Sequence, residues 1–320
     1  MPIPAGMLEI FATVAPIFLI VCVGFGAVRG GIVSRDGVKG MAAFLVNIAM
    51  PALVFGAISS RSLADVMDGN FLFAYGGGSL TIFVAMLALS LTVLGRQLTG
   101  ASIYSVGSSL SNTLMVGFPT ATALLGAAAL PAFAMVLLVE NLVMLPLALI
   151  IADAGRGPAG GLAAALKRIW HSVLKNPLVL AIVLGVLVSA APISPPDAVM
   201  TALDLLGRAV AGMGLFIVGG MLVGFRYSGN LRDVSCVVLA KLLLHPAAVL
   251  LIFLVLPAAE PEMMIAGVTM AAAPVFGASV AIAERYGLGS IAAAVVAPAT
   301  VLSFLSMSLL ILLATSIWGG

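Results

Sequence analysis

Long apolar runs separated by short polar intervals make up most of the chain, and this pattern predicts membrane-spanning helices. A helix rises 1.5 Å per residue, so about 20 apolar residues cross a hydrocarbon layer roughly 30 Å thick. We divide the sequence at charged residues and at Gly/Pro clusters and number the resulting spans 1 to 10. They cover residues 8–28, 40–60, 71–94, 102–128, 131–152, 173–192, 202–224, 233–256, 263–283 and 290–317.

The polar interval at residues 153–172 lies near the middle of the chain and separates residues 1–152 from residues 173–320. Each half contains five predicted spans. Because five is an odd number, a second copy made by duplication starts from the opposite membrane face, so the repeats are expected to be inverted. The sequence thus predicts an all-α membrane protein of two inverted five-helix repeats joined by a cytoplasmic linker.

The basic residues predict the orientation of the chain. If the N-terminus lies outside, the odd-numbered loops are cytoplasmic and carry 11 of the 14 basic residues. Cytoplasmic loops of membrane proteins are enriched in Lys and Arg, so both termini are expected on the non-cytoplasmic side. Residues 1–6 lack the basic stretch of a secretory signal peptide, and the first apolar run is expected to be a retained span.

Composition narrows the function classes. The chain is 62% apolar and 8% charged with a net charge of +2, whereas soluble domains carry about a quarter charged residues. No basic surface is available, so nucleic acid is not an expected partner. Cys22 and Cys236 lie in apolar runs without a CxxC motif, and we interpret them as inert buried thiols rather than as metal ligands or a disulfide.

Helix-breaking residues recur in corresponding spans of the two halves. Span 4 contains NTLMVGFP at residues 112–119 and span 9 contains AAAPVFG at residues 271–277. The two prolines are 155 residues apart (274 − 119), close to half of the 320-residue chain. A broken helix persists in hydrocarbon only where protein or water satisfies its backbone. Paired breaks in inverted repeats therefore indicate a transporter site at the membrane midplane.

Each break is expected to present the amino end of a half-helix, with free amides after Pro119 and Pro274. Such an end attracts anions, so a carboxylate is the expected guest. Asn47, four residues before Pro51, is expected to line the same cavity. The other predicted substrate-binding residues are Asn112, Thr113, Gly117, Pro119, Thr120, Pro274, Gly277 and Ser279.

Charged residues are also predicted inside the membrane. Glu140, followed by Asn141, lies near the middle of span 5, and Lys241 enters span 8 with His245 one turn further on. An ionisable group at the bilayer centre costs about 2.5–3.5 kcal/mol on insertion scales, so Glu140 and Lys241 are expected to meet. Two interpretations stay open: a site that couples transport to H⁺ or Na⁺, and an ion pair that only holds the domain together. His245 similarly fits a proton relay or a packing role.

The motif at residues 112–119 resembles the broken fourth span of the auxin efflux carrier (PIN-type) family, whose pattern is Asn-Thr-Leu-(apolar)₂-Gly-(apolar)-Pro. Residues 48–59 resemble the family's second span, and residues 211–214 its seventh. Residues 273–274 and 283–286 resemble the ninth span and the loop after it. With its short central loop, the chain is similar to the compact bacterial branch, which includes malonate-transporter-like proteins.

The resemblance implies a ten-helix fold, similar to those of bile-acid transporters and sodium–proton antiporters, in which helices 4 and 9 are broken and cross. Spans 1, 2, 6 and 7 would form a scaffold, and spans 3–5 and 8–10 a moving, elevator-type transport domain. The resemblance also implies a homodimer through the scaffold and a place in the bacterial cytoplasmic membrane. Asn112 and the backbone around Pro119 and Pro274 would bind the substrate carboxylate.

The expected function is secondary transport of a small organic anion, auxin-like or malonate-like, by alternating access. Both a monocarboxylate and a dicarboxylate remain open, since only Lys241 and Arg208 add positive charge to the helix dipoles. The alternative is an intramembrane sensor that binds such an anion without translocating it. No GxxxxGK[ST], HExxH or GxSxG motif occurs, so neither an enzyme nor a cofactor beyond a coupling H⁺ or Na⁺ is expected.

Overall fold

The computed structural model describes residues 7–60, 67–156, 175–191, 195–224, 230–256 and 260–319. This described part is helical, apart from turns and an isolated antiparallel bridge between Ser111 and Val275. Most of the expected linker lies outside the described residues, and so do Arg61, Lys167, Arg168 and Arg226.

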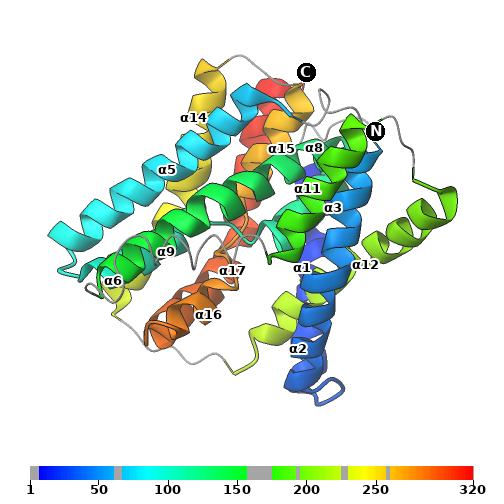
Figure 1. Cartoon of the computed structure of the whole chain (residues 1–320). Coiled ribbons are helices and arrows are strands. Elements are labelled where there is room, and N and C mark those ends of the chain that lie inside the picture. Colours follow the sequence, from blue (N-terminus) through cyan, green and yellow to red (C-terminus); the bar gives the residue numbers. More distant parts are fainter. Residues whose placement is uncertain are drawn as a thin grey trace.

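Seven helical runs in the described residues are long and apolar enough to cross a membrane, and the protein is an all-helical membrane protein (Figure 1). They are Leu8–Arg29, Arg35–Ser59, Gly69–Thr92, Thr113–Ala154, Asp197–Met221, Leu231–Val255 and Gly289–Trp318. The 42-residue run Thr113–Ala154 is interrupted at Gly126, whose φ of +60° ends one helix before the next begins. A further apolar helix, Pro177–Ala190, is shorter.

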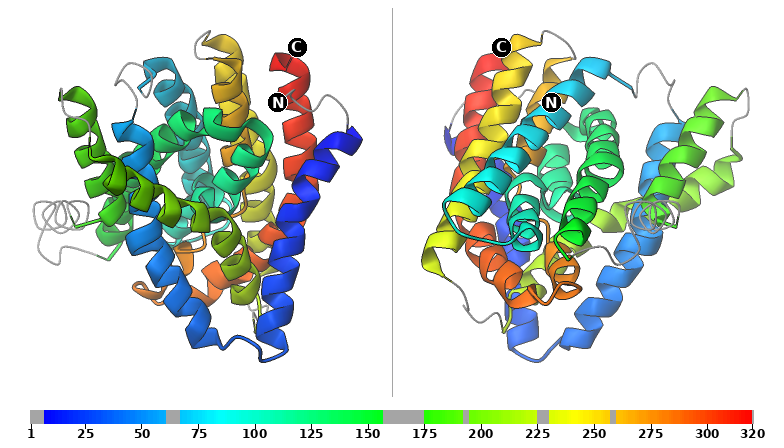
Figure 2. Two further views of the ribbon diagram at one scale, coloured as in Figure 1. Left: turned by 90° about the vertical axis from the view of Figure 1, so that its right-hand side faces the viewer. Right: turned by 60° about the vertical axis from the view of Figure 1, so that its left-hand side comes forward.

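The helices of the first half are α1 (Met7–Arg29), α2 (Arg35–Phe44), α3 (Met50–Ser59), α5 (Gly69–Thr92), α6 (Leu98–Ser109), α7 (Phe118–Leu125), α8 (Ala129–Leu138) and α9 (Leu145–Ala154). Those of the second half are α11 (Pro177–Ala190), α12 (Asp197–Met221), α13 (Leu231–Leu239), α14 (His245–Val255), α15 (Pro261–Ala272), α16 (Ser279–Glu284) and α17 (Gly289–Trp318). The turn between α1 and α2 lies at the end of the molecule away from both termini (Figure 2).

The helices gather in two groups. In the first, α12 packs along α1 and α3, and α11 packs along α3. In the second, α5 packs against α6 and α14, while α15 packs against α14 and α17. Figure 1 shows α1, α3, α11 and α12 on the right and α5, α6, α9 and α14 on the left. The interrupted segments lie where the two groups meet, because the run that leads into α7 contacts both α12 and α15.

Four π-helical turns interrupt the α-helices. They are Leu45–Ala49 (η1), Thr113–Gly117 (η2), Val139–Met144 (η4) and Ala240–Leu244 (η5). Each precedes a proline at the second position of the next α-helix: Pro51, Pro119, Pro146 and Pro246. Proline lacks an N–H and clashes with the carbonyl four residues back, and a wider turn relieves that clash. These helices therefore continue through their prolines.

The break in span 4 lies before Pro119 rather than at it. Helix α6 ends at Ser109, and the chain is helical again from Thr113 to Leu125. The expectation of free amides after Pro119 was therefore wrong, because η2 accommodates the proline without unwinding. Gly117 is also helical, with φ −61° and ψ −52°. It instead allows close packing, since a Cβ there would lie 3.1 Å from the Met270 Cα in α15.

The break in span 9 is where the sequence predicted it. Helix α15 ends at Ala272, Pro274 lies in the non-helical segment that follows, and α16 begins at Ser279. The interpretation of both cysteines as buried was wrong for Cys22, which is exposed on the outer face of α1, whereas Cys236 is half-buried.

Glycines allow α1 and α12 to touch through their backbones. A Cβ on Gly219 of α12 would lie 1.8 Å from the Val21 carbonyl oxygen of α1, and one on Gly24 would lie 2.1 Å from the Phe216 carbonyl oxygen. Small residues of this kind permit close helix contact in membranes, where apolar burial adds little.

We predict that Gly219→Ala destabilises the protein by about 1–3 kcal/mol or more, because the added methyl meets backbone that cannot rotate away. The control is Gly212→Ala on the same helix, where a Cβ has no neighbour within 4 Å. Thermal unfolding in detergent should show a lower Tm for Gly219→Ala and an unchanged or higher Tm for the control. Equal Tm values would contradict this packing.

Candidate functional site

The two unwound segments pair with each other. The Asn112 N–H donates to the Pro274 carbonyl at 2.7 Å, and the Phe276 N–H donates to the Leu110 carbonyl at 3.4 Å. These reciprocal bonds flank the bridge between Ser111 and Val275. Each break thus satisfies part of the other's backbone in the interior of the protein.

Glu140, in the π turn η4, holds one side of this pairing. Its Oε1 accepts hydrogen bonds from the Tyr75 hydroxyl at 3.0 Å, the Ser111 N–H at 3.2 Å and the Thr113 hydroxyl at 2.9 Å. The Glu140 side chain is buried. Three donors on one oxygen offset the cost of burying a carboxyl group and fix where the helical run after Asn112 begins.

Lys241, in the π turn η5, holds the other side. Its Nζ donates to the Ser111 hydroxyl at 2.6 Å and to the Ala271 carbonyl at 2.7 Å, and lies 2.8 Å from the His245 Nδ1. An ammonium group has three N–H bonds and no acceptor, so the His245 Nδ1 accepts and its Nε2–H is left to face the Ser79 hydroxyl at 2.9 Å. All three donors of Lys241 are used.

Ser111 joins the two charged residues. Its N–H binds Glu140 and its hydroxyl binds Lys241. No ion pair within 4 Å joins Glu140 directly to Lys241 in the described part of the chain. Glu140 and Lys241 therefore meet through Ser111 rather than through an ion pair within 4 Å.

Sequence reasoning missed three members of this network: Ser111, Tyr75 and Ser79. A signal for each was present. Ser111 directly precedes the motif at residues 112–119, and Tyr75 and Ser79 are polar residues four apart in an apolar run, so they share one helix face.

The Asn112 side chain is placed to receive a ligand. Its amide makes no hydrogen bond to any described residue, although the side chain is only 7% exposed. Gly277 lies beside it, since a Cβ there would be 3.9 Å from the Asn112 Nδ2. Helix α12 packs directly on the next turn, where a Cβ on Gly214 would lie 3.2 Å from the Met115 Cα. An unbonded amide thus lies where the two helix groups meet, at the start of a 13-residue helical run.

The remaining predicted site residues divide into near and distant ones. Ser279 is buried just after the second break, and its hydroxyl has no hydrogen-bond partner within the described ranges of the chain. Thr120 is buried, but its hydroxyl bonds to the Val116 carbonyl of its own helix. Asn47 is exposed and bonds to the Ala43 carbonyl. Asn141 bonds to the Leu137 carbonyl and accepts from Asn176 at the start of α11. Thr120, Asn47 and Asn141 therefore do not join the network at the breaks.

Residues 283–286, one of the segments that carried the family resemblance, tie the end of α16 to α9. The Tyr286 hydroxyl donates to the Asp153 Oδ1 at 2.8 Å, and the Arg156 guanidinium lies 4.4 Å from the centre of the Tyr286 ring. Burial, with the bond to the Asp153 carboxylate, raises the pKa of Tyr286 to about 12, so the phenol stays protonated and keeps donating.

Known proteins match most of the chain. The sequence model of the family described as "Membrane transport protein" matches residues 9–159 and 162–311. The chain belongs to this family. A "Putative malonate transporter" of Rhizobium meliloti (strain 1021) is 24% identical over 282 residues, which are 88% of each protein. A "Lysosomal cholesterol signaling protein" of Mus musculus is 27% identical over 118 residues, 36% of this chain and 14% of that protein.

Family membership confirms the resemblance to the auxin efflux carriers. The protein is a membrane transport protein and not an enzyme.

We predict that Glu140 and Lys241 are energetically coupled through Ser111. Lys241→Met alone leaves three acceptors without their donor, and removing one partner of a buried charge pair costs about 3–5 kcal/mol. In a double-mutant cycle with Glu140→Gln, measured by unfolding in detergent, the double variant should lose less than the sum of the single losses, by about 0.5–3 kcal/mol. The matched control is the exposed pair Asp204–Arg208, whose cycle should give almost no coupling. Additive losses at Glu140 and Lys241 would contradict the network.

Proposed function

We propose that the protein is a secondary transporter that carries a small organic anion across the membrane by elevator-type alternating access. The observation that supports this most is the unbonded Asn112 amide beside Gly277, at the amino end of the helical run that follows the first break. Helix amino ends carry a partial positive charge and unpaired N–H groups. A carboxylate is the ligand that suits such a site.

The proposed fold is ten transmembrane helices in two inverted five-helix repeats. The bridge Ser111–Val275 sets an offset of 164 residues (275 − 111). Adding 164 to the first residues of α5, α6 and the α2–α3 run gives residues 233, 262 and 199. These lie within two residues of the starts of α13, α15 and α12. The reciprocal bonds around the bridge are what a two-fold axis through it would produce. Helical segments of the described residues fall in every predicted span.

The proposed scaffold consists of α1, α2, α3, α11 and α12, which are spans 1, 2, 6 and 7. The proposed transport domain contains the remaining helices. The close packing of α1 on α12 supports a rigid scaffold, and the bonds among α5, η4, η5 and the two breaks support a transport domain that moves as one unit. Substrate at Asn112 would lie on the face that slides past α12.

The proposed orientation places both termini outside the cytoplasm of a bacterium, in its cytoplasmic membrane. In Figure 1, α2 and α16 lie at the lower end of the molecule and α6 lies at the left, all away from both termini. This Arg-rich end is proposed to be cytoplasmic because Lys39 lies within α2 and the following residues lie at or next to helix ends: Arg29, Arg35, Arg96, Arg156, Arg232 and Arg285. We also propose that two copies of the protein form a homodimer through their scaffolds. Native mass spectrometry of the protein in nanodiscs measures the mass of the assembly and so distinguishes one copy from two.

The substrate class is proposed to be a small carboxylate. The similarity to a protein named "Putative malonate transporter" supports a short acid. Lys241 uses its three donors within the protein, so it leaves little positive charge for a second carboxylate group. A panel of mono- and dicarboxylates in proteoliposome counterflow separates these two classes.

For substrate binding, we predict that Asn112→Ala raises the half-saturation concentration for the transported acid roughly tenfold to a hundredfold. A hydrogen bond to a charged group contributes about 1.5–3 kcal/mol, and each 1.4 kcal/mol is a factor of ten. Uptake into proteoliposomes measures this change. Thr315→Ala, which removes a buried hydroxyl bonded only within α17, is the control and should transport normally. Unchanged kinetics for Asn112→Ala would remove this residue from the site.

For ion coupling, we propose that Glu140 carries the coupling H⁺ or Na⁺ site together with Lys241 and His245. Glu140→Gln should then abolish any dependence of transport on pH or sodium, while counterflow, which needs no driving ion, continues. If the dependence persists in Glu140→Gln, Glu140 has only the structural role of holding Ser111 and Thr113.

A sensor that binds an anion without moving it is the second candidate, and the similarity to a lysosomal cholesterol signaling protein favours it. The matched segment is 14% of that protein, so most of its length has no counterpart in the alignment. Saturable binding without counterflow in proteoliposomes would establish the sensor in place of the transporter.

A further inference from the structure

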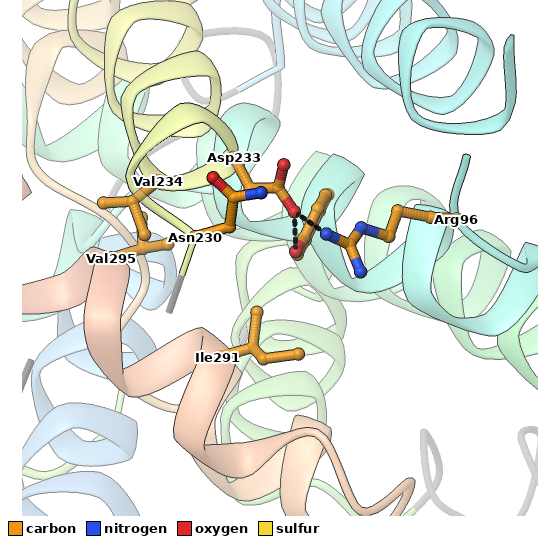
Figure 3. A pocket seen from close by; sticks show the side chains of 7 residues that line it. Arg96, Asn230, Asp233, Val234, Ile291 and Val295 are labelled. Carbon is orange, nitrogen blue, oxygen red and sulfur yellow. Dashed lines mark hydrogen bonds and ion pairs between the residues drawn. The ribbon is translucent and has the colours of Figure 1, made fainter. Parts of the chain in front are cut away.

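A cavity of about 270 Å³ opens among α6, α13 and α17, near the Arg-rich end of the second helix group (Figure 3). Arg96, Tyr104 and Asp233 form its polar wall, and Ile291 and Val295 form part of its apolar wall. A second cavity of about 10 Å³ adjoins it, because Tyr104, Ile291 and Val295 line both. Ser279 and Val275 line this inner cavity, which therefore reaches the second break.

Polar atoms on these walls lack partners. The Arg96 Nε and the Ser279 hydroxyl are buried without a hydrogen bond to any described residue. The same is true of the Val275 N–H and C=O, because the bridge with Ser111 directs the reciprocal bonds to the residues on either side. Buried polar groups are rarely left unbonded, so unpartnered groups at both cavities point to water.

The charge on the wall argues against an anion in the outer cavity. The Arg96 Nη2 lies 2.5 Å from the Asp233 Oδ2, and the Tyr104 hydroxyl donates to the same oxygen at 2.7 Å, as the dashed lines of Figure 3 mark. The guanidinium is therefore already neutralised by a buried carboxylate. Water, which can both donate and accept, suits the mixture of unpartnered donors and acceptors.

The volumes agree with this choice. A cavity can hold a water molecule when about 10–15 Å³ of its volume is open to the centre of that molecule. The inner cavity has room for about one water, beside Ser279 and Val275, and the outer cavity has room for several.

We propose that the two cavities form a hydrated inlet that brings water from the Arg-rich end, through the interior of the second helix group, to Ser279 and the Val275 backbone. The inlet is separate from the proposed substrate site, since Asn112 does not line it. It ends beside Val275, whose bridge partner Ser111 binds both Glu140 and Lys241. The charged network behind the breaks thereby gains a route for proton exchange that does not pass along the substrate path.

Radiolytic hydroxyl-radical labelling with mass spectrometry tests the inlet, because modification inside a membrane protein follows the presence of water. The wild-type chain contains a matched pair: Tyr104 and Tyr75 are both buried and both donate to a carboxylate, but of the two, Tyr104 lines both of the cavities described above and Tyr75 lines neither. In nanodiscs, Tyr104 should be modified several-fold faster than Tyr75. Equal rates would overturn the proposal.

The inner end is tested with a second matched pair. Ser279 and Thr269 are both buried with hydroxyls that find no partner among the described residues, but of the two, Ser279 lines the inner cavity and Thr269 lines neither cavity. The thiol of Ser279→Cys should be oxidised several-fold faster than that of Thr269→Cys, and adding Ile291→Phe, which narrows both cavities, should remove the difference. Fast labelling of Tyr104 with a protected thiol in Ser279→Cys would confine the water to the outer cavity and overturn the inlet. If the Ile291→Phe variant does not fold, the comparison of the two single thiols decides.

Discussion

The structure depends on one constraint: a helix that unwinds within a bilayer must find partners for its backbone in the protein. Here each unwound segment supplies partners to the other, through the bonds Asn112–Pro274 and Phe276–Leu110. Two of the peptide groups that this pairing leaves unbonded find charged side chains as partners. Glu140 accepts the Ser111 N–H, and Lys241 donates to the Ala271 carbonyl at the end of α15. Two buried charges are thus the means by which the breaks persist.

The hydrogen bonds to Ser111 give Glu140 and Lys241 a structural role that does not depend on ion coupling. Ser111 binds Glu140 through its backbone and Lys241 through its hydroxyl, so a change at either charge reaches the break itself. All five polar positions of the described π turns, Asn47, Thr113, Glu140, Asn141 and Lys241, lie four to six residues before a proline. The wider turn needed by the proline is also what aims Thr113, Glu140 and Lys241 at the crossing point.

Hydropathy predicted an all-helical membrane protein with long apolar helices, of which seven are found in the described residues, and the proline at residue 274 predicted the second break, because apolar length and a missing backbone donor are local properties. The first break was misplaced by treating Pro119 as a helix breaker, when η2 absorbs it. Pairing the two prolines gave an offset of 155 residues for the proposed repeats, whereas the two bridge residues Ser111 and Val275 are 164 residues apart (275 − 111). The place of Ser111 next to the motif at residues 112–119 was a signal in the sequence, but its bonds to Glu140 and Lys241 come from the meeting of distant helices, which local patterns do not predict. Asn112 was selected correctly as a residue at the first break.

We propose that the two paired breaks jointly hold a negatively charged guest. An experimental structure of the protein in nanodiscs, at a saturating concentration of an organic acid that it binds, is the decisive test. Density for the carboxylate is expected between the Asn112 amide and Gly277, at the amino end of the run Thr113–Gly117. A carboxylate bound elsewhere, for example on Arg96, with the Asn112 amide still unbonded, would contradict it.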